Sequence, residues 1–179
     1  MEIIEPLEEV KESKTLIIIK KTFTILIALF LIFIVSTYII PGSQILDIIE
    51  GKLVSKELDN NLSIIQKDKT IIFNKETYEE LLQIYYTNQI HEFKVCIKGT
   101  LNNNIFYLNQ IERPFIIAQN IFSVTSEPCS KETLVSLHSH PENHCIPSKQ
   151  DIKSNKKFQE NNPDSISGIM CSKNRFNFY

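Results

Sequence analysis

Residues 134–151, LVSLHSHPENHCIPSKQD, place two histidines, a serine and an aspartate at fixed offsets. Three apolar residues run into His138 and predict a strand, in which residues two apart point to the same face. Pro141 cannot continue a strand ladder, so we expect the strand to end there and a loop to carry the chain away. The imidazoles of His138 and His140 should therefore project together.

The second half of this stretch predicts the start of a helix. Ser148 follows a proline and precedes the polar run 149–158, so it is expected to cap a helix with Asp151 at the third helical position. That geometry would bring the carboxylate back toward His138 and His140. Two imidazole nitrogens and one carboxylate oxygen suit Zn2+, and three protein ligands leave the fourth position open for water, as in catalytic sites.

Taken alone, a His-x-His pair is common and indicates no more than two polar loop histidines. The full string, HxHP followed by six residues and SxxD, is more restrictive and resembles the JAMM motif of the MPN/JAB zinc metalloprotease family. The positions in register are His138, Ser139, His140, Pro141, Ser148 and Asp151. The resemblance covers about residues 70–179. It implies an α+β domain with a mixed β-sheet flanked by a few helices, and one Zn2+ per chain held by His138, His140 and Asp151.

The family also has a glutamate upstream, in a pattern like E-x-C-G-L-L-x-G. Glu92 and Gly99 keep the outer positions of this pattern, whereas Lys94 and Val95 replace its Cys-Gly. Glu92 is the candidate for that glutamate, and an exposed carboxylate at a strand edge is the alternative interpretation. Three further glutamates are worse candidates because they lie in a helical pattern well before the strand. These are Glu76, Glu79 and Glu80.

The resemblance implies a chemical role for each of these residues. Zinc lowers the pKa of water and polarises the substrate carbonyl. Glu92 would take the water proton as general base and return it to the leaving amine as general acid. Ser148 would donate a hydrogen bond to the oxyanion, while helix capping alone is an equally compatible role. The reaction implied is hydrolysis of a peptide or isopeptide bond in a protein or peptide substrate, with ubiquitin-like conjugates among the candidates.

A second feature lies near the N-terminus, where residues 22–40, TFTILIALFLIFIVSTYII, carry no charge. This run is long enough to cross a hydrocarbon core as a helix, and we expect a single-pass transmembrane segment in contact with the lipid bilayer. The alternatives are a buried helix or a cleaved signal peptide, but the run exceeds a signal h-region and lacks a convincing cleavage site. More lysines precede the span than follow it, which favours an inside N-terminus and leaves the side of the domain open. They are Lys11, Lys14, Lys20 and Lys21 before it, and Lys52 and Lys56 after it.

These features divide the 179 residues into four parts. They are an N-terminal tail (1–21), the transmembrane helix (22–40), an amphipathic stalk or linker (41–69) and the JAMM-like metalloprotease domain (70–179). The stalk is expected to contain a short helix because its apolar residues recur at near-helical spacing. The net charge is −2 and no basic cluster stands out after the span, so nucleic acid is not an expected partner.

Within the domain, local patterns predict the order of the elements. Asn74 is expected to cap a helix whose apolar stripe packs in the core and which ends near Asn88. Strands are predicted at 71–73, 93–97, 105–108, 115–124, 134–138, 166–171 and 175–179.

The cysteines leave the compartment open. Cys96, Cys129, Cys145 and Cys171 could form two disulfides, but no CxxC occurs and a reduced domain could carry them equally well. His144 and Cys145 lie inside the motif loop and could compete for metal. Because their offsets match no ligand position of the family, they are interpreted as loop residues.

Three functions from different classes follow. A membrane-anchored zinc metalloprotease is favoured because every ligand position is filled. A catalytically silent MPN-like domain that binds a partner at the membrane is the alternative, kept open by the altered surroundings of Glu92. A nuclease-type or DNA-repair-associated relative is disfavoured by the membrane span and the lack of a basic patch.

Overall fold

The computed structural model describes residues 13–39, 44–140 and 144–179. The contacts divide the chain into two units, Met1–Ser43 and Gln44–Tyr179. Each unit is described by itself.

The first unit contains one helix, α1 (Lys14–Ile39), of 26 residues. Within it, Lys14–Ser36 has a mean hydropathy of 2.4 and no buried residue, so the helix is long and apolar enough to cross a membrane. A signal sequence near the N-terminus can meet the same criterion of length and hydropathy. The helix begins before the expected residue 22 because the preceding lysines are good helix formers, and Ile40 lies outside the described residues.

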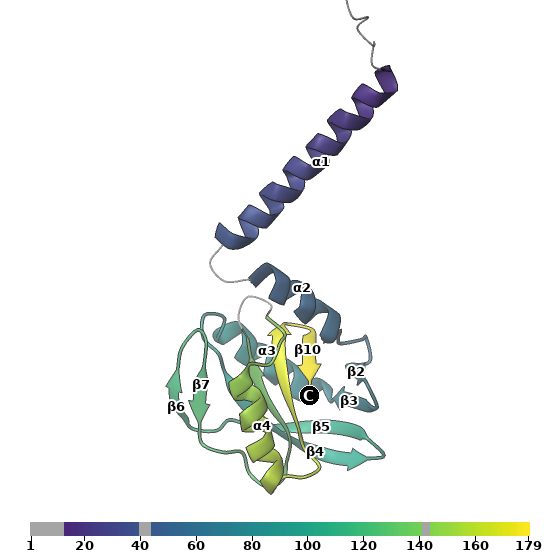
Figure 1. The fold of residues 1–179 in the computed structure, drawn as a ribbon. Coiled ribbons are helices and arrows are strands. Elements are labelled where there is room, and N and C mark those ends of the chain that lie inside the picture. Colours follow the sequence, from purple (N-terminus) through teal and green to yellow (C-terminus); the bar gives the residue numbers. More distant parts are fainter. Residues whose placement is uncertain (1–12, 40–43, 141–143) are drawn as a thin grey trace, which may run out of the picture. The chain divides into compact units, whose positions relative to one another are not determined.

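The second unit is built around an eight-stranded mixed sheet with flanking helices, which confirms the predicted fold class at that level (Figure 1). The strand order is β1-β10-β9-β8-β4-β5-β3-β2. Two neighbouring pairs, β3 with β5 and β8 with β9, are parallel and the others are antiparallel. The helices are α2 (Gln44–Val54), α3 (Lys75–Thr87) and α4 (Lys149–Asn161). The strands are β1 (Lys56–Glu57), β2 (Ser63–Gln66), β3 (Lys69–Phe73), β4 (Lys94–Asn102), β5 (Ile105–Glu112), β6 (Ile116–Gln119), β7 (Val124–Ser126), β8 (Thr133–Ser139), β9 (Ile166–Ser172) and β10 (Arg175–Phe178).

The central strands place their apolar and polar side chains on opposite faces. Along β8, Val135 and Leu137 belong to the hydrophobic core that also contains Leu81 of α3. Ser136 and His138 alternate with them and therefore point to the other face. We call the two sides the core face and the site face. The alternation means that the strand delivers its first histidine away from the core.

The helices differ in how they meet the sheet. Asn74 caps α3, where its side chain accepts a hydrogen bond from the Thr77 N–H, and Leu81 and Ile84 are buried, as predicted. None of the residues of α4 is buried. Because α4 does not pack closely, space is left between it and the site face of the sheet.

The sheet begins earlier in the chain than the sequence pattern indicates. The sequence predicts a stalk or linker over residues 41–69, yet within this range β1 pairs with β10 and β2 pairs with β3. The predicted short helix is present as α2, and a Cβ at Gly51 would lie only 3.0 Å from the Cys145 amide nitrogen. The lack of a side chain at Gly51 lets α2 approach the motif loop closely, so the helix is part of the folded unit.

One predicted strand is wrong in its extent. Residues 115–124 do not form a single strand of the sheet but contribute to a separate hairpin of β6 and β7. The Asn120 side chain accepts hydrogen bonds from the Phe122 N–H and the Ser123 hydroxyl. This turn stabilised by an asparagine side chain reverses the chain and interrupts the apolar run.

Candidate metal centre

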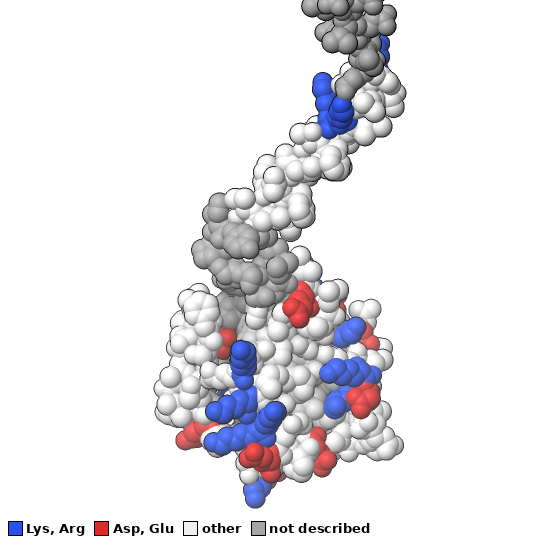
Figure 2. Space-filling view, in the orientation of Figure 1, with Lys and Arg blue, Asp and Glu red and all other residues white. Residues whose placement is uncertain are grey.

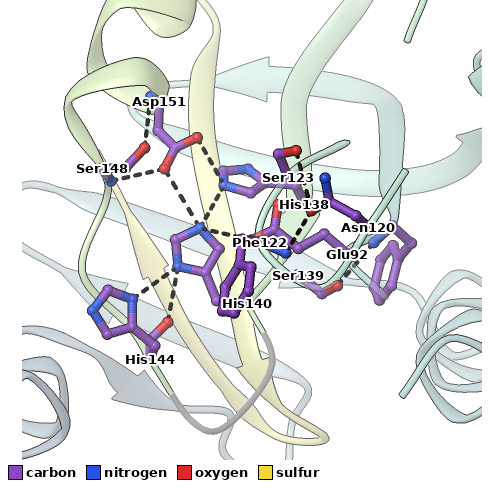
Figure 3. Close-up of polar contacts among 11 residues, drawn as sticks. Glu92, Asn120, Phe122, Ser123, His138, Ser139, His140, His144, Ser148 and Asp151 are labelled. Atoms are coloured by element: carbon purple, nitrogen blue, oxygen red, sulfur yellow. Dashed lines mark hydrogen bonds and ion pairs between the residues drawn. The ribbon is translucent and has the colours of Figure 1, made fainter. Parts of the chain in front are cut away.

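His138 and His140 converge at the end of β8, as their spacing predicts (Figure 3). Their Nε2 atoms lie 3.1 Å apart, and the two residues are 9% and 7% exposed. The His140 N–H donates to the Met170 carbonyl oxygen of β9, so the backbone stays paired beyond the last residue of β8. The two imidazole nitrogens therefore face one small volume with little access to bulk water.

Asp151 reaches this volume from the first turn of α4. The helix begins with a capping box, in which the Ser148 hydroxyl accepts from the Asp151 N–H at 3.1 Å. In return, the Ser148 N–H donates to Asp151 Oδ2 at 2.7 Å. The same carboxylate lies 3.3 Å from His138 Nε2 and 3.4 Å from His140 Nε2. The cap thus fixes the direction of the carboxylate.

The three side chains fit a zinc ion. Two ligand atoms that each bind a tetrahedral zinc at about 2.0–2.1 Å lie about 3.3 Å apart. The observed separations are close to this value: 3.1 Å between the two Nε2 atoms, 3.3 Å from His138 Nε2 to Asp151 Oδ1 and 3.4 Å from His140 Nε2 to Asp151 Oδ2. Ligand atoms of His138, His140 and Asp151 form a group that could hold a metal ion. Three protein ligands leave one tetrahedral position for water or substrate.

The motif loop fixes the tautomer of one histidine. His140 Nδ1 lies 3.1 Å from the backbone oxygen of His144. That oxygen can only accept, so a hydrogen bond to it requires the proton on Nδ1 and leaves the Nε2 lone pair for a metal. His144 also stacks on the His140 ring, with centroids 5.4 Å apart. This backbone contact was not predicted, because the histidine spacing does not show where the loop carbonyls point.

Glu92 lies beside the three ligands, two residues before the start of β4. Its Oε1 is 3.7 Å from His140 Nε2, and the residue is 7% exposed, so it is not the exposed carboxylate of the alternative interpretation. The Glu92 N–H donates to the Asn120 carbonyl oxygen, and the Gln119 side chain donates to the Glu92 carbonyl oxygen. The β6–β7 hairpin therefore fixes the backbone that carries this carboxylate.

The two carboxylates at the site have opposite pKa shifts. Burial raises the pKa of Glu92 to about 7, opposed by the nearby His140. Burial also acts to raise the pKa of Asp151, but hydrogen bonds from His138 and His140 outweigh it and hold that pKa well below its usual range. Burial lowers the pKa of His138, which favours the neutral imidazole that a metal requires. At neutral pH the site thus offers an ionised ligand in Asp151 and a titrating neighbour in Glu92.

Ser148 lines the cavity beside the metal centre and is exposed to solvent. Its hydroxyl oxygen is occupied as the acceptor of the helix cap. The Ser148 side chain also hydrogen-bonds the Asp151 carboxylate and helps to lower the pKa of that group. A hydroxyl can rotate, so a bound molecule could accept its hydrogen in place of the carboxylate. Capping and donation are compatible, as the sequence analysis allows.

A cavity of about 820 Å³ adjoins these residues. Its walls come from α4, the site face of the sheet and the loop between β6 and β7, and Ile48 of α2 also lines it. Phe122, at the tip of the hairpin, is 82% exposed. The cavity includes Lys94 of β4, one of the two residues that depart from the family pattern around Glu92.

The four cysteines form two disulfides, Cys96–Cys129 and Cys145–Cys171, with Cα atoms 5.6 and 5.3 Å apart. The second bond joins the motif loop to β9. Cys145 is fully buried and its sulfur is bonded, so Cys145 does not compete for metal. Its carbonyl oxygen accepts from the Asn177 side chain of β10, which further fixes the loop.

Neither the protein-family models nor the curated proteins include one that matches this chain. Among solved structures, the chain is similar to a JAB1/MPN domain protein from Archaeoglobus fulgidus, with a TM-score of 0.39 and 18% sequence identity. The similarity covers 60% of this chain and 86% of that chain. The fold class and the site described above rest on the geometry of this chain itself.

Proposed function

We propose that this protein is a membrane-anchored, zinc-dependent hydrolase of peptide or isopeptide bonds. The observation that carries this proposal is the convergence of His138, His140 and Asp151, whose ligand atoms lie at separations that suit a zinc ion, with a buried glutamate beside them. The resemblance of the motif to JAMM metalloproteases supports the same assignment.

The chemistry follows from the placement of the side chains. Zinc held by the three ligands would supply Lewis acidity to water and to the substrate carbonyl. Glu92 accepts the proton of the attacking water, because its carboxylate lies at the metal centre and its pKa of about 7 suits proton transfer at neutral pH. It then returns that proton to the leaving amine. The Ser148 hydroxyl donates to the oxyanion that develops at the carbonyl oxygen when water attacks the carbonyl carbon.

The disulfides and the distribution of the lysines together support one side of the membrane for the domain. Disulfides persist in oxidising compartments and are rare in the cytosol. The excess of lysines before residue 22 favours an N-terminus on the cytosolic side, which places the domain on the opposite, oxidising side. An exported protein or peptide is therefore the proposed substrate, in preference to a cytosolic ubiquitin-like conjugate. Protease protection in intact cells tests the side of the membrane.

The test uses the full chain, purified in detergent and loaded with zinc. A peptide library is incubated with the protein and cleavage is followed by mass spectrometry. Wild-type protein is expected to cleave a subset of peptides, and Glu92→Gln should bind zinc equally well but cleave at least 100-fold more slowly. Cleavage by Glu92→Gln at the wild-type rate would contradict the proposed role of Glu92. Stoichiometric zinc without cleavage of any peptide would instead favour the silent binding domain.

A further inference from the structure

Lys94 occupies a position in the cavity that the mechanism above does not use. It pairs with His138 across β4 and β8, and paired residues of neighbouring strands point to the same face. Its side chain accordingly lines the cavity on the site face, next to the metal ligands. Lys94 is half-buried, and its side chain has no hydrogen bond or ion pair with any described residue.

Within residues 13–39, 44–140 and 144–179, no side chain or carbonyl group forms a hydrogen bond or ion pair with the Lys94 ammonium group. An ammonium group that has lost part of its water gains most when an anion completes its hydrogen bonds. We propose that Lys94 determines substrate specificity by binding a carboxylate of the substrate close to the bond that is hydrolysed. This inference rests on the proposed function, because it names the substrate class of the same site.

The charges around the site agree with an anionic substrate. Asp151 and an ionised Glu92 would together balance at most one divalent cation, which leaves the charge of Lys94 without a counterion among the described residues of the site. Two further lysines, Lys131 and Lys157, line the cavity and are exposed.

The helix that carries Asp151 adds to this positive field. Figure 2 shows Lys and Arg side chains gathered over the area that α4 occupies in Figure 1. The exposed lysines of α4 have no ion-pair partner in the part of the chain that the structure describes. They are Lys149, Lys153, Lys156 and Lys157. Such a field raises the local concentration of anionic ligands and falls with added salt.

The carboxylate could come from two sources with the same chemistry. One is the free C-terminal carboxylate of the substrate, when the leaving amine belongs to its last residue. The other is an aspartate or glutamate side chain beside the scissile bond. Both present a single planar anion to Lys94. The experiments below first test the anion site itself and then separate the two sources.

The direct test measures binding of small dicarboxylates to the zinc-loaded full chain in detergent. Succinate, glutarate and adipate are each compared with the corresponding monoamide by isothermal titration calorimetry. Both members of a pair have one carboxylate for the metal, and only the diacid has a second for Lys94. At least one diacid should bind about 10- to 100-fold more tightly than its monoamide. This preference should be lost in Lys94→Met and retained in the control Lys153→Met, which changes an exposed lysine that does not line the cavity.

The outcomes separate this inference from the proposed function. Equal affinity of the wild-type protein for every diacid and its monoamide, or a preference that survives in Lys94→Met, overturns the anion site. Neither result depends on catalysis, so the anion site can be confirmed in a protein that cleaves no peptide. Circular dichroism and zinc content of Lys94→Met show whether the variant is folded and loaded, and Lys94→Arg should restore part of the preference.

Peptide substrates then identify the source of the carboxylate. One pair differs only in a free or amidated C-terminus, and a second pair differs only in Glu or Gln beside the scissile bond. Lys94→Met should reduce kcat/KM about 10- to 100-fold for the anionic member of one pair, mainly through KM, and should leave the neutral member almost unchanged. An equal loss on anionic and neutral peptides would contradict the inference.

Discussion

The Ser139 hydroxyl oxygen accepts a hydrogen bond from the Phe93 N–H at 3.0 Å, and the Ser139 N–H donates to the Phe93 carbonyl oxygen at 3.0 Å. Ser139, which lies between the two histidines, thus binds both the N–H and the carbonyl oxygen of Phe93, the residue that follows Glu92. Ser139 is 4% exposed, so water does not readily replace these bonds. The pair couples the position of the general base to the strand that carries the metal ligands.

Ser139→Ala should lower kcat while zinc affinity stays close to that of the wild type. The substitution leaves the buried Phe93 N–H without its acceptor and loosens the position of Glu92. A displacement on the order of 1 Å can reduce catalysis about 100-fold, and we expect a loss of about 10- to 100-fold in kcat. Steady-state kinetics and zinc content check this. Ser139→Thr retains the hydroxyl and should recover most of the rate, and full activity of Ser139→Ala would show that Ser139 does not position Glu92.

Glu92→Gln should stabilise the metal-free protein at alkaline pH. The pKa of Glu92 is raised by burial from 4.5 to about 7 in the folded state, so the folded protein holds its proton where the unfolded chain has released it. Stability therefore falls as pH rises from about 4.5 to 7, and the neutral glutamine avoids this loss. At pH 8 the variant should be more stable by at most about 3 kcal/mol, and near pH 4 the difference should vanish.

Denaturation of the full chain in detergent with a chelator, at pH 4 to 8, measures this difference. Glu127→Gln provides the control, because Glu127 is exposed and its substitution should not change the pH dependence. A Glu92→Gln protein with the same pH profile as the wild type would indicate that this carboxylate is not buried in the folded protein.

Removal of the Cys145–Cys171 disulfide should weaken both the fold and the metal site. The bond closes a loop of sequence separation 26, for which the chain-entropy model gives about 3 kcal/mol. The loop also places the His144 carbonyl against His140, so zinc affinity should fall in Cys145→Ser combined with Cys171→Ser. Removing Cys96–Cys129 should cost similar stability with a smaller effect on zinc. Zinc affinity is measured by competition with a chromophoric chelator. Equal zinc affinity in the two double variants would show that the disulfide of the motif loop does not support the metal site.

The parts of the site that depend on local geometry could be predicted from the sequence. The spacing of His138 and His140 follows from the period of a strand, and the capping box fixes Asp151 relative to Ser148. Asn74 could be identified as a helix cap for the same reason. In each case the information lies within a few residues of the feature.

The parts that depend on distant contacts could not be predicted in this way. The pairing of Lys56 with Phe176, which adds β1 to the sheet, leaves no local signal in a two-residue strand. The connectivity of four cysteines is likewise not determined by their spacing. The break of the 115–124 run at Asn120 depends on two side-chain hydrogen bonds in a turn, and asparagine alone is a weak indication of them.

The most direct test of the account is the metal content and coordination of the full chain. We predict one zinc per chain, and X-ray absorption should show nitrogen and oxygen ligands at about 2.0–2.1 Å without sulfur. His138→Ala and Asp151→Ala should each lose the metal, whereas Glu92→Gln should retain it. Absence of stoichiometric zinc in the folded wild-type protein, or zinc that persists after both ligand substitutions, would contradict the assignment.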